Sequence, residues 1–297
     1  MKDAGAPSRP LLQRVFARSW TNIAGTFAVI GRRFRRRPAQ YDRIFWLSWT
    51  LGFSLLAGLA AIFLDRASVC DWPPAFKAVA EMSTPLGLGE WYLWPATAWI
   101  LLANQIDWSR LGRKQLIAVY NRTSISLFVL AAVGLPGLLT ILLKILIGRA
   151  RPALYDEYGA FSFHPFTVKA IFASFPSGHA TTIGSVSAIL VLLFPRGKYV
   201  FLLLGLWFAS TRIFVGAHYP SDTIVGFGLG FGLAVVTAIV CARLGFLFRS
   251  NPIGLPRLKR TVWRTPKAER TLSFYAAHNQ PAAQRQSVSV FGNTDTI

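Results

Sequence analysis

The sequence predicts an all-α, polytopic membrane protein built as a bundle of six transmembrane helices. Of its 297 residues, 53% are hydrophobic and only 15% are charged, whereas a soluble domain usually carries about a quarter charged residues. The apolar residues also gather into long runs, and roughly 20 apolar residues are enough for a helix to span the bilayer core. Composition and clustering together favour a membrane protein over a protein with a large soluble core.

Six apolar runs are the basis for the predicted helix count. Three contain no charged residue and are long enough to span, at residues 44–64, 123–143 and 223–242. The other three are short or carry one charge near an end: residues 86–103 with Glu90, residues 180–194, and residues 199–217 with Arg212. We expect no cleaved signal peptide, because the apolar stretch before Arg32 is short and interrupted. The first span then directs insertion.

The basic residues predict the orientation of these spans. The formal net charge is +20, from 32 Lys and Arg against 12 Asp and Glu. Such an excess can indicate nucleic-acid binding, but here it gathers in segments that six spans place on one side: residues 1–43, 104–122, 195–198 and 243–297. The positive-inside rule makes that side cytoplasmic. We interpret the charge as a topology signal whose basic tails also bind anionic lipid headgroups, and we expect no nucleic-acid partner.

The same patterns divide the chain into three parts. Residues 1–43 form a basic extension, residues 44–245 the membrane domain, and residues 246–297 a basic tail whose Pro, Gln, Asn, Ser and Thr content predicts disorder. In the extension, residues 10–31 place large apolar side chains three and four apart. This spacing predicts an amphipathic helix on the cytoplasmic membrane surface; the alternative is an extension packed on the bundle. Residues 72–90 predict a short interfacial helix that ends at Pro85-Leu86-Gly87.

Glycines and cysteines add two expectations about packing and cofactors. Glycine at alternate positions of the last span predicts close helix packing, within one subunit by default, at Gly226, Gly228, Gly230 and Gly232. Cys70 and Cys241 fall on opposite sides of the predicted membrane, so no disulfide is expected. No Cys and His residues have the spacing of a metal site, so we expect neither a metal nor another cofactor.

Three short clusters carry the chemistry, and each lies at or near one end of an apolar segment. They are Lys144-x6-Arg151-Pro152, Pro176-Ser177-Gly178-His179 and Arg212-x5-His218-x3-Asp222. Alternating the six spans places all three on the non-cytoplasmic side. The shared location predicts a single site with three cations, two imidazoles and a carboxylate.

The cations predict that this site binds phosphate. Lys144, Arg151 and Arg212 lie on the side that the positive-inside rule depletes of basic residues, and buried charges are costly unless they pair or line a hydrated site. An Arg fork matches phosphate oxygens in bidentate fashion, and a Lys adds a point charge. The second cluster begins a helix, where Gly178 lets an anion approach free backbone N–H groups.

The histidines supply a nucleophile and an acid. Asp222 follows His218 by four residues, so its carboxylate can accept a hydrogen bond from one imidazole nitrogen and leave the other exposed as a nucleophile. His179, at the start of its helix, would point at the leaving-group oxygen. His164 lies in a loop, where a solvated role is expected.

Taken together, the three ordered clusters resemble the signature of the type 2 phosphatidic acid phosphatase (PAP2) superfamily over about residues 44–245. One position departs from the pattern, because Thr211 precedes Arg212 where the family usually has Ser; a hydroxyl is retained. The resemblance implies a six-helix membrane fold and metal-independent hydrolysis. It makes His218 the nucleophile that forms a phosphohistidine, Asp222 the residue that orients it, and His179 the general acid.

The resemblance also implies which residues bind the phosphoryl oxygens, namely Lys144, Arg151, Ser177, Gly178 and Arg212. We therefore expect a lipid phosphate phosphatase of a bacterial-type inner membrane, acting at the periplasmic face with both termini in the cytoplasm. Candidate substrates are undecaprenyl diphosphate, phosphatidylglycerophosphate, phosphatidate and the phosphates of lipid A. One alternative is a phosphotransferase that passes the phosphate to another lipid. A non-catalytic lipid-phosphate transporter is a second, which the complete set of His218, Asp222 and His179 disfavours.

Overall fold

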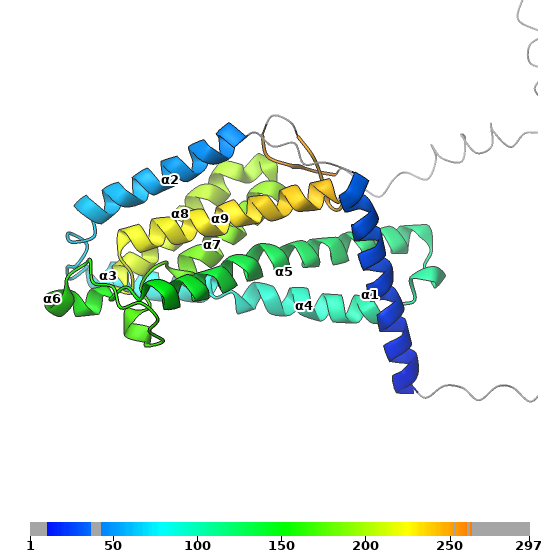
Figure 1. Cartoon of the computed structure of the whole chain (residues 1–297), viewed down its shortest axis with the longest axis horizontal. Helices are drawn as coiled ribbons and strands as arrows, with labels where there is room; N and C mark the ends of the chain where they lie inside the picture. Colours follow the sequence, from blue (N-terminus) through cyan, green and yellow to red (C-terminus); the bar gives the residue numbers. More distant parts are fainter. Residues whose placement is uncertain (1–10, 37–42, 252–253, 260–261, 263–297) are drawn as a thin grey trace, which may run out of the picture. The chain divides into compact units, whose positions relative to one another are not determined.

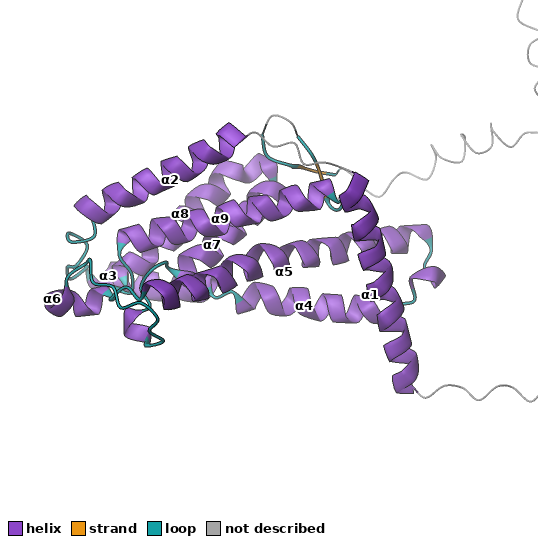
Figure 2. Ribbon diagram, viewed as in Figure 1, coloured by secondary structure: helices purple, strands orange, loops and turns teal. Residues whose placement is uncertain are grey.

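The structure is a computed structural model that describes residues 11–36, 43–251, 254–259 and 262. Nearly all regular structure in these residues is helical (Figures 1 and 2), which confirms the all-α prediction. The α-helices are α1 (Leu11–Arg36), α2 (Arg43–Phe63), α3 (Pro74–Ser83), α4 (Glu90–Gln105), α5 (Arg113–Ile147), α6 (Tyr155–Tyr158), α7 (Gly178–Leu193), α8 (Lys198–Phe214) and α9 (Pro220–Arg243). Short 3-10 helices are η1 (Thr84–Gly87), η2 (Trp108–Arg110), η3 (Pro152–Leu154), η4 (Ala170–Phe172) and η5 (Pro195–Gly197).

Each of the six apolar runs forms one helix, in order α2, α4, α5, α7, α8 and α9. By length and composition, α5 and α9 are the two described helices able to cross a membrane, while α7 and the part of α2 from Leu47 are shorter apolar helices. Helix α5 starts ten residues before its predicted span, at a turn where Gly112 N donates to Gln115 Oε1 at 3.2 Å. The helices are confirmed, and the number of membrane crossings stays a prediction.

The contact between α7 and α9 is the core of the bundle. Both helices are largely buried; α7 also packs against α5 and α8, and α9 against α2. A Cβ at Gly230 would lie 1.9 Å from Thr181 O, and one at Gly226 would lie 2.5 Å from Ser177 O. Only glycine allows two helix backbones to approach this closely. The glycines of the last span therefore pack within the subunit, as predicted.

The helices alternate in direction, so the ends that carry the sequence clusters lie together. Figure 1 shows the C-terminal ends of α2 and α5 and the N-terminal end of α9 at one end of the bundle, beside α3 and α6. Helix α1 lies at the opposite end, where Asn22 Nδ2 donates to Asn104 O of α4 at 2.9 Å. We call the first end the cluster end and the second the basic end.

Two predicted segments outside the six helices also form helices. Helix α1 leaves large apolar side chains exposed along its length, at Phe16, Trp20, Ile23 and Phe27. Helix α3 and the turn η1 form the short helix that was expected over residues 72–90. The helical part of both predictions is confirmed, and their position at a membrane surface stays a prediction.

The tail differs from expectation at its start. Residues 248–258 contain the antiparallel strands β1 (Phe248–Arg249) and β2 (Arg257–Leu258), with Phe248 opposite Leu258. Phe248 is buried against Phe128 of α5, with ring centroids 5.0 Å apart. This burial extends the packed unit as far as Lys259. Residues 263–297 lie outside the described residues.

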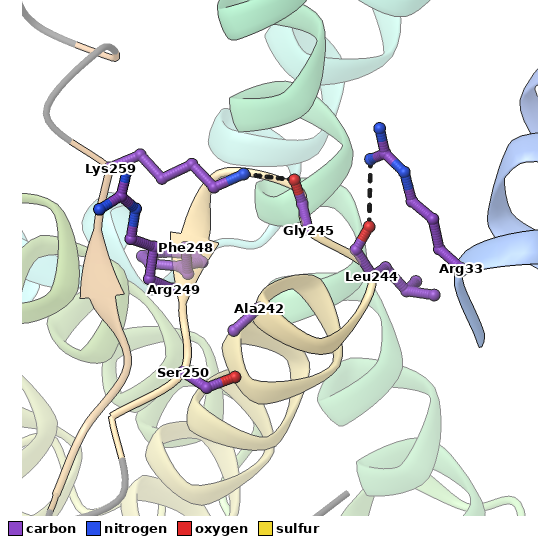
Figure 3. Close-up of a pocket in the computed structure, with 8 residues that line it drawn as sticks. All are labelled: Arg33, Ala242, Leu244, Gly245, Phe248, Arg249, Ser250 and Lys259. Atoms are coloured by element: carbon purple, nitrogen blue, oxygen red, sulfur yellow. Dashed lines mark hydrogen bonds between the residues drawn. The ribbon is translucent and has the colours of Figure 1, made fainter. Parts of the chain in front are cut away.

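A cavity of 590 Å³ lies at the basic end, between α1, the end of α9 and the two strands. Arg33 Nη1 donates to Leu244 O at 3.1 Å, and Lys259 Nζ donates to Gly245 O (Figure 3). Cations at the C-terminus of a helix offset the partial negative charge of its last carbonyls. The cavity contains none of the predicted site residues, so we interpret these contacts as a cap on α9.

Candidate active site

The first cluster occupies the C-terminal end of α5 and the loop after it. Lys144 lies in the last turn of α5, which ends at Gly148 in the left-handed conformation (φ 61°). Lys144 Nζ donates a hydrogen bond to Ala173 O, and Arg151 Nε donates to Ala170 O at 2.9 Å. Both cations are therefore held by carbonyls of residues 170–174. No sequence motif marks this loop as part of the site.

The second cluster forms the start of α7. Ser177 is the N-cap residue, and its Oγ accepts a hydrogen bond from Ala180 N at 3.4 Å. A Cβ at Gly178 would lie 3.9 Å from Cε of Lys144, so the lysine chain runs beside the first turn of the helix. Backbone N–H groups in a first turn carry partial positive charge and bind anions. The structure thus joins the first two clusters.

The third cluster links the end of α8 to the start of α9. Arg212 lies in the last turn of α8, and its Nη1 donates to Thr84 Oγ1 of η1 at 3.1 Å. His218 precedes α9 and is 3% exposed, while Asp222 lies in the first turn of α9 and is fully buried. Ser177 N donates to Asp222 O at 3.1 Å, which ties the start of α7 to the start of α9.

Electrostatic contacts show that the three clusters converge. Members of all three interact with one another: Lys144 with Arg151, Arg212 and Asp222, and His179 with Lys144, Arg151, Arg212 and His218. Three buried nitrogens in this group form no hydrogen bond with any described residue: His179 Nε2, Arg212 Nε and His218 Nδ1. Since buried polar atoms in native proteins nearly always have partners, a ligand with several acceptor oxygens fits this place.

A glycine in η1 fixes the place of His179. A Cβ at Gly87 would lie 2.7 Å from Cδ2 and 2.9 Å from Cβ of the histidine. Contacts under about 3 Å between such carbons are strongly repulsive. The His179 side chain therefore packs on the bare backbone of η1, where no side chain fits.

The chain matches the family model described as "PAP2 superfamily" over residues 125–245. Two curated relatives are each named lipid A 1-phosphatase. The relative from Rhizobium johnstonii is 38% identical over 247 residues, which cover 80% of this chain and 98% of the relative. The relative from Rhizobium etli is 42% identical over 205 residues, which cover 67% of this chain and 86% of the relative. This chain belongs to the PAP2 superfamily. No solved structure matches it.

Membership in the PAP2 superfamily, with these relatives, makes the protein a lipid phosphatase. The position that departs from the family pattern, Thr211, donates from Oγ1 to Phe208 O at 2.7 Å within its own helix. Its hydroxyl is thus used inside α8. In the described part of the chain, no three His, Cys, Asp or Glu residues lie close enough together to hold a metal ion.

The carboxylate of this PAP2 enzyme is held differently from the prediction. Asp222 Oδ2 accepts hydrogen bonds from Ser174 Oγ at 2.6 Å and from Tyr219 N at 3.1 Å. His218 Nδ1 lies 3.8 Å from the same oxygen, which is too long for a hydrogen bond. The predicted His218–Asp222 hydrogen bond is therefore replaced by a longer electrostatic contact, because two other donors occupy this oxygen.

Burial sets the charge state of His218. It lowers the pKa of the imidazole to about 4; the Asp222 carboxylate opposes this shift, and Lys144 and Arg151 reinforce it. A pKa in that range leaves His218 neutral near pH 7, as a nucleophile requires.

Sequence reasoning missed two charged residues next to Asp222. Arg149 is 3% exposed and Asp65 is fully buried, and they form an ion pair at 2.7 Å. The signals were available, since Arg149 lies on the side predicted to be poor in cations and Asp65 directly follows the first apolar run. Their pairing across 84 positions could not be read from either segment alone.

His164 is accounted for by local contacts. Its Nε2 lies 3.1 Å from Ser162 Oγ, and its ring packs on Phe172 with centroids 4.2 Å apart. The histidine thus helps to hold the loop between the first two clusters, and we assign it no chemical step.

Proposed function

We propose that this lipid phosphatase hydrolyses the 1-phosphate of lipid A at the periplasmic face of a bacterial-type inner membrane, through a phosphohistidine at His218 and without a metal ion. The observation that carries the chemistry is that unpaired buried nitrogens of His179 and Arg212 lie in the same group of interacting residues as His218. The choice of lipid A is supported by the two relatives named lipid A 1-phosphatase. The match covers 98% of one of them.

The first step transfers the phosphoryl group to His218. The ring nitrogen that faces away from Asp222 attacks phosphorus, and the bond between phosphorus and the lipid oxygen breaks as the N–P bond forms. The negative charge of the bound phosphate favours the protonated form of His179, which gives its proton to that oxygen, so the lipid leaves with a neutral hydroxyl. The hydroxyl of Ser177 and the first-turn N–H group of Gly178 bind non-bridging oxygens, together with Lys144, Arg151 and Arg212.

The second step releases phosphate. A water molecule attacks phosphorus on the phosphohistidine while neutral His179 takes its proton, and the N–P bond breaks to return His218. Asp222 stabilises the positive charge that the His218 ring carries in the intermediate. Inorganic phosphate leaves and His179 is protonated again.

The donor set supports chemistry without a metal. Three cations and a helix N-terminus supply the charge stabilisation that a divalent ion supplies in other phosphatases. Divalent ions such as Mg²⁺ prefer carboxylate ligands. Asp222 supplies a carboxylate at this site, but its oxygens already accept hydrogen bonds from Arg149, Ser174 and Tyr219. The site is therefore suited to bind the anion directly.

Exposed apolar side chains support a membrane location. Leucine and isoleucine side chains remain exposed along α2, α5 and α8, at Leu47, Leu51, Leu55, Leu59, Ile62, Leu138, Ile141, Leu142, Leu203, Leu204 and Leu206. Soluble monomers rarely expose apolar patches of this extent. Helix α7 has 16 residues and is thus about 24 Å long, shorter than a bilayer core of about 30 Å. A short, central α7 would recess His179 below the headgroup level, within reach of a lipid phosphate.

The substrate assignment is tested with purified protein and a panel of lipid phosphates. We expect inorganic phosphate release from lipid A, with loss of the 1-phosphate seen by mass spectrometry, and slower or no release from undecaprenyl diphosphate, phosphatidylglycerophosphate and phosphatidate. The rate should be unchanged in EDTA. Preference for another lipid would overturn the substrate, and activity lost in EDTA and restored by magnesium would overturn the metal-free mechanism. Phosphate appearing on a second lipid instead of in solution would indicate a phosphotransferase.

The orientation is tested with the native Cys70, which is exposed in the loop after α2 at the cluster end. In cells with a permeabilised outer membrane, an impermeant thiol reagent should label Cys70. The matched variant combines Cys70→Ser with Gly112→Cys, whose position is exposed at the start of α5. It should be labelled only after lysis. The reverse pattern would place the site in the cytoplasmic leaflet.

A further inference from the structure

A buried set of charged and polar residues lies behind Asp222, and we call it the Arg149 cluster: Asp65, Arg149, Ser221 and Asp222. The guanidinium of Arg149 donates from Nη1 to Asp222 Oδ1 and, at 2.8 Å, to Ser221 Oγ. Its Nη2 donates to Asp65 Oδ2 at 2.7 Å. Ser221 closes the cluster, because its N donates to Asp65 Oδ1 at 3.0 Å and its Oγ donates to Asp65 Oδ2 at 2.6 Å.

The remaining contacts of Arg149 hold it rigidly in this position. Its Nε and Nη2 both donate to Ala160 O, at 3.0 and 2.8 Å. Its guanidinium carbon lies 4.4 Å from the centroid of the Tyr219 ring, within the range of a cation–π interaction. Burial alone would lower the pKa of Arg149, but Asp222 and Asp65 outweigh burial and raise it. The residue is therefore a fixed cation.

The formal charge of the Arg149 cluster is −1, because two carboxylates share one guanidinium. A buried ion cluster adds little net stability, since well-packed apolar side chains of the same volume often stabilise a fold as well or better. Stability alone thus gives a weak reason for two buried carboxylates at this place. A stronger reason is that Asp222 lies beside His218 and that Asp65 is joined to Asp222 through Arg149.

We infer that Asp65 and Arg149 are positioning residues for phosphoryl transfer, which act through Asp222 and do not touch the substrate. An arginine paired with Asp222 alone would neutralise that carboxylate. Asp65 takes the other side of the guanidinium, so one net negative charge remains next to His218. That charge stabilises the imidazolium that forms as the N–P bond forms. The inference rests on the proposed role of His218 as nucleophile.

The cluster also brings α2 into the site. Asp65 lies two residues after the end of α2, Arg149 lies two residues after the end of α5, and Ser221 and Asp222 lie in the first turn of α9. The three signature clusters lie on α5, α7, α8 and α9 and the links between them, so Asp65 is a contribution of the N-terminal part of the bundle, in addition to Thr84 and Gly87 of η1. A loss of activity on changing Asp65 would therefore show that α2 has more than a packing role.

Asp65→Asn tests the inference, because it keeps the shape of the side chain and removes its charge. We expect kcat to fall about 10- to 100-fold, by analogy with the loss found when residues that support the ligands of a metal site are changed. The inhibition constant of inorganic phosphate should stay within about twofold, since Lys144, Arg151 and Arg212 are untouched. A distorted site would instead weaken phosphate binding and kcat together. Asp65→Glu, which restores the charge, should recover part of kcat.

The matched control is Asp71→Asn, in the same loop but fully exposed and paired with Lys77 in a 3.3 Å surface contact. It should keep wild-type kcat. Thermal denaturation shows whether Asp65→Asn is folded; if it is not, Ser221→Ala decides, because it removes hydrogen bonds to Asp65 and Arg149 without removing a charge. We expect about a tenfold loss of kcat for Ser221→Ala at unchanged phosphate inhibition.

Two outcomes would overturn the inference. The first is a folded Asp65→Asn, or failing that Ser221→Ala, with kcat within twofold of wild type. The second is a fall in kcat matched by an equal loss of phosphate affinity, which would mark a structural role. His218→Ala in the same assay separates this failure from failure of the proposed function. If His218→Ala stays active, the nucleophile assignment fails, and if it is inactive while Asp65→Asn is not, only the positioning role fails.

Discussion

Cations at the two ends of the bundle are held in opposite ways. At the cluster end, Arg149 is buried and shared between two carboxylates, and Lys144 and Arg151 donate to carbonyls of one loop. At the basic end, Arg110 keeps a side chain that is 85% exposed in its contact with Asp107, and Arg33 donates to the end of α9. Arg149 thus lies in a buried, fixed environment, whereas Arg110 lies in an exposed one where it can be replaced.

The contrast teaches where basic residues carry chemistry. An exposed ion pair contributes at most about 1 kcal/mol, whereas removing one partner of a buried pair costs about 3–5 kcal/mol. Exposed cations can therefore be exchanged freely provided that their sum still sets topology. Buried cations cannot, so their presence at the cluster end indicates selection for function.

The largest expected effect comes from removing the proposed nucleophile. His218→Ala should lower kcat by more than 1,000-fold, about 4 kcal/mol or more in barrier height, because no N–P bond can form. The three cations remain, so inhibition by inorganic phosphate should persist. Phosphate release is the measurement, and retention of more than about a tenth of the wild-type rate contradicts the assignment.

Exchanging one cation at each end tests the comparison directly. Arg151→Gln should lower kcat/KM about 10- to 100-fold, since a hydrogen bond to a charged group contributes about 1.5–3 kcal/mol. Arg249→Gln, at an exposed position of β1, should leave kcat/KM within twofold. Steady-state kinetics on lipid A checks both. If Arg151→Gln and Arg249→Gln changed kcat/KM equally, cations at the two ends of the bundle would not differ in their importance for activity.

A smaller effect is expected from the backbone contact of His179. Gly87→Ala places a methyl group 2.7 Å from the His179 ring and must shift it, so kcat should fall about tenfold, or ~1.4 kcal/mol in the barrier. The control is Gly89→Ala, because a Cβ there meets its nearest atom at 3.7 Å. Gly89→Ala should behave like wild type. If both variants are fully active, Gly87 does not position the proposed acid.

The smallest effect concerns mild acid. With a His218 pKa of about 4, lowering the pH from 7 to 5.5 should reduce kcat/KM less than about twofold through this group, whereas an ordinary histidine (pKa ≈ 6.5) would cost about tenfold. Protonation below the folded-state pKa removes the nucleophile, so activity falls on the acid side. The lowered pKa of His218 also stabilises the folded state above about pH 6.5, because the folded protein favours the neutral imidazole. This contribution to the free energy of unfolding is lost as the pH falls toward 4. An acid limb centred near pH 6.5, in an enzyme with Lys144, Arg151 and Asp222 intact, would contradict this environment.

Much of the fold could be predicted because each helix of the bundle corresponds to one continuous apolar run in the sequence. The six runs all became helices, and alternation alone predicted that the three clusters share one end. What could not be predicted depends on contacts between distant segments. The carbonyls of residues 170–174 that hold Lys144 and Arg151 leave no sequence signal, and Ser174 takes the Asp222 oxygen that was expected to bind His218. The buried strand residue Phe248 was hidden in a segment of disordered composition.

The ion pair between Asp65 and Arg149 has a consequence for the smallest unit that can fold and act. The family match covers residues 125–245, and Asp65 lies 60 positions before it. A fragment trimmed to the matched region would bury Arg149 and Asp222 with one carboxylate too few. Supplied as a separate polypeptide, residues 1–70 should instead restore activity to residues 71–297 by complementation, because the exposed Cys70 and Asp71 mark a loop where the chain can be cut.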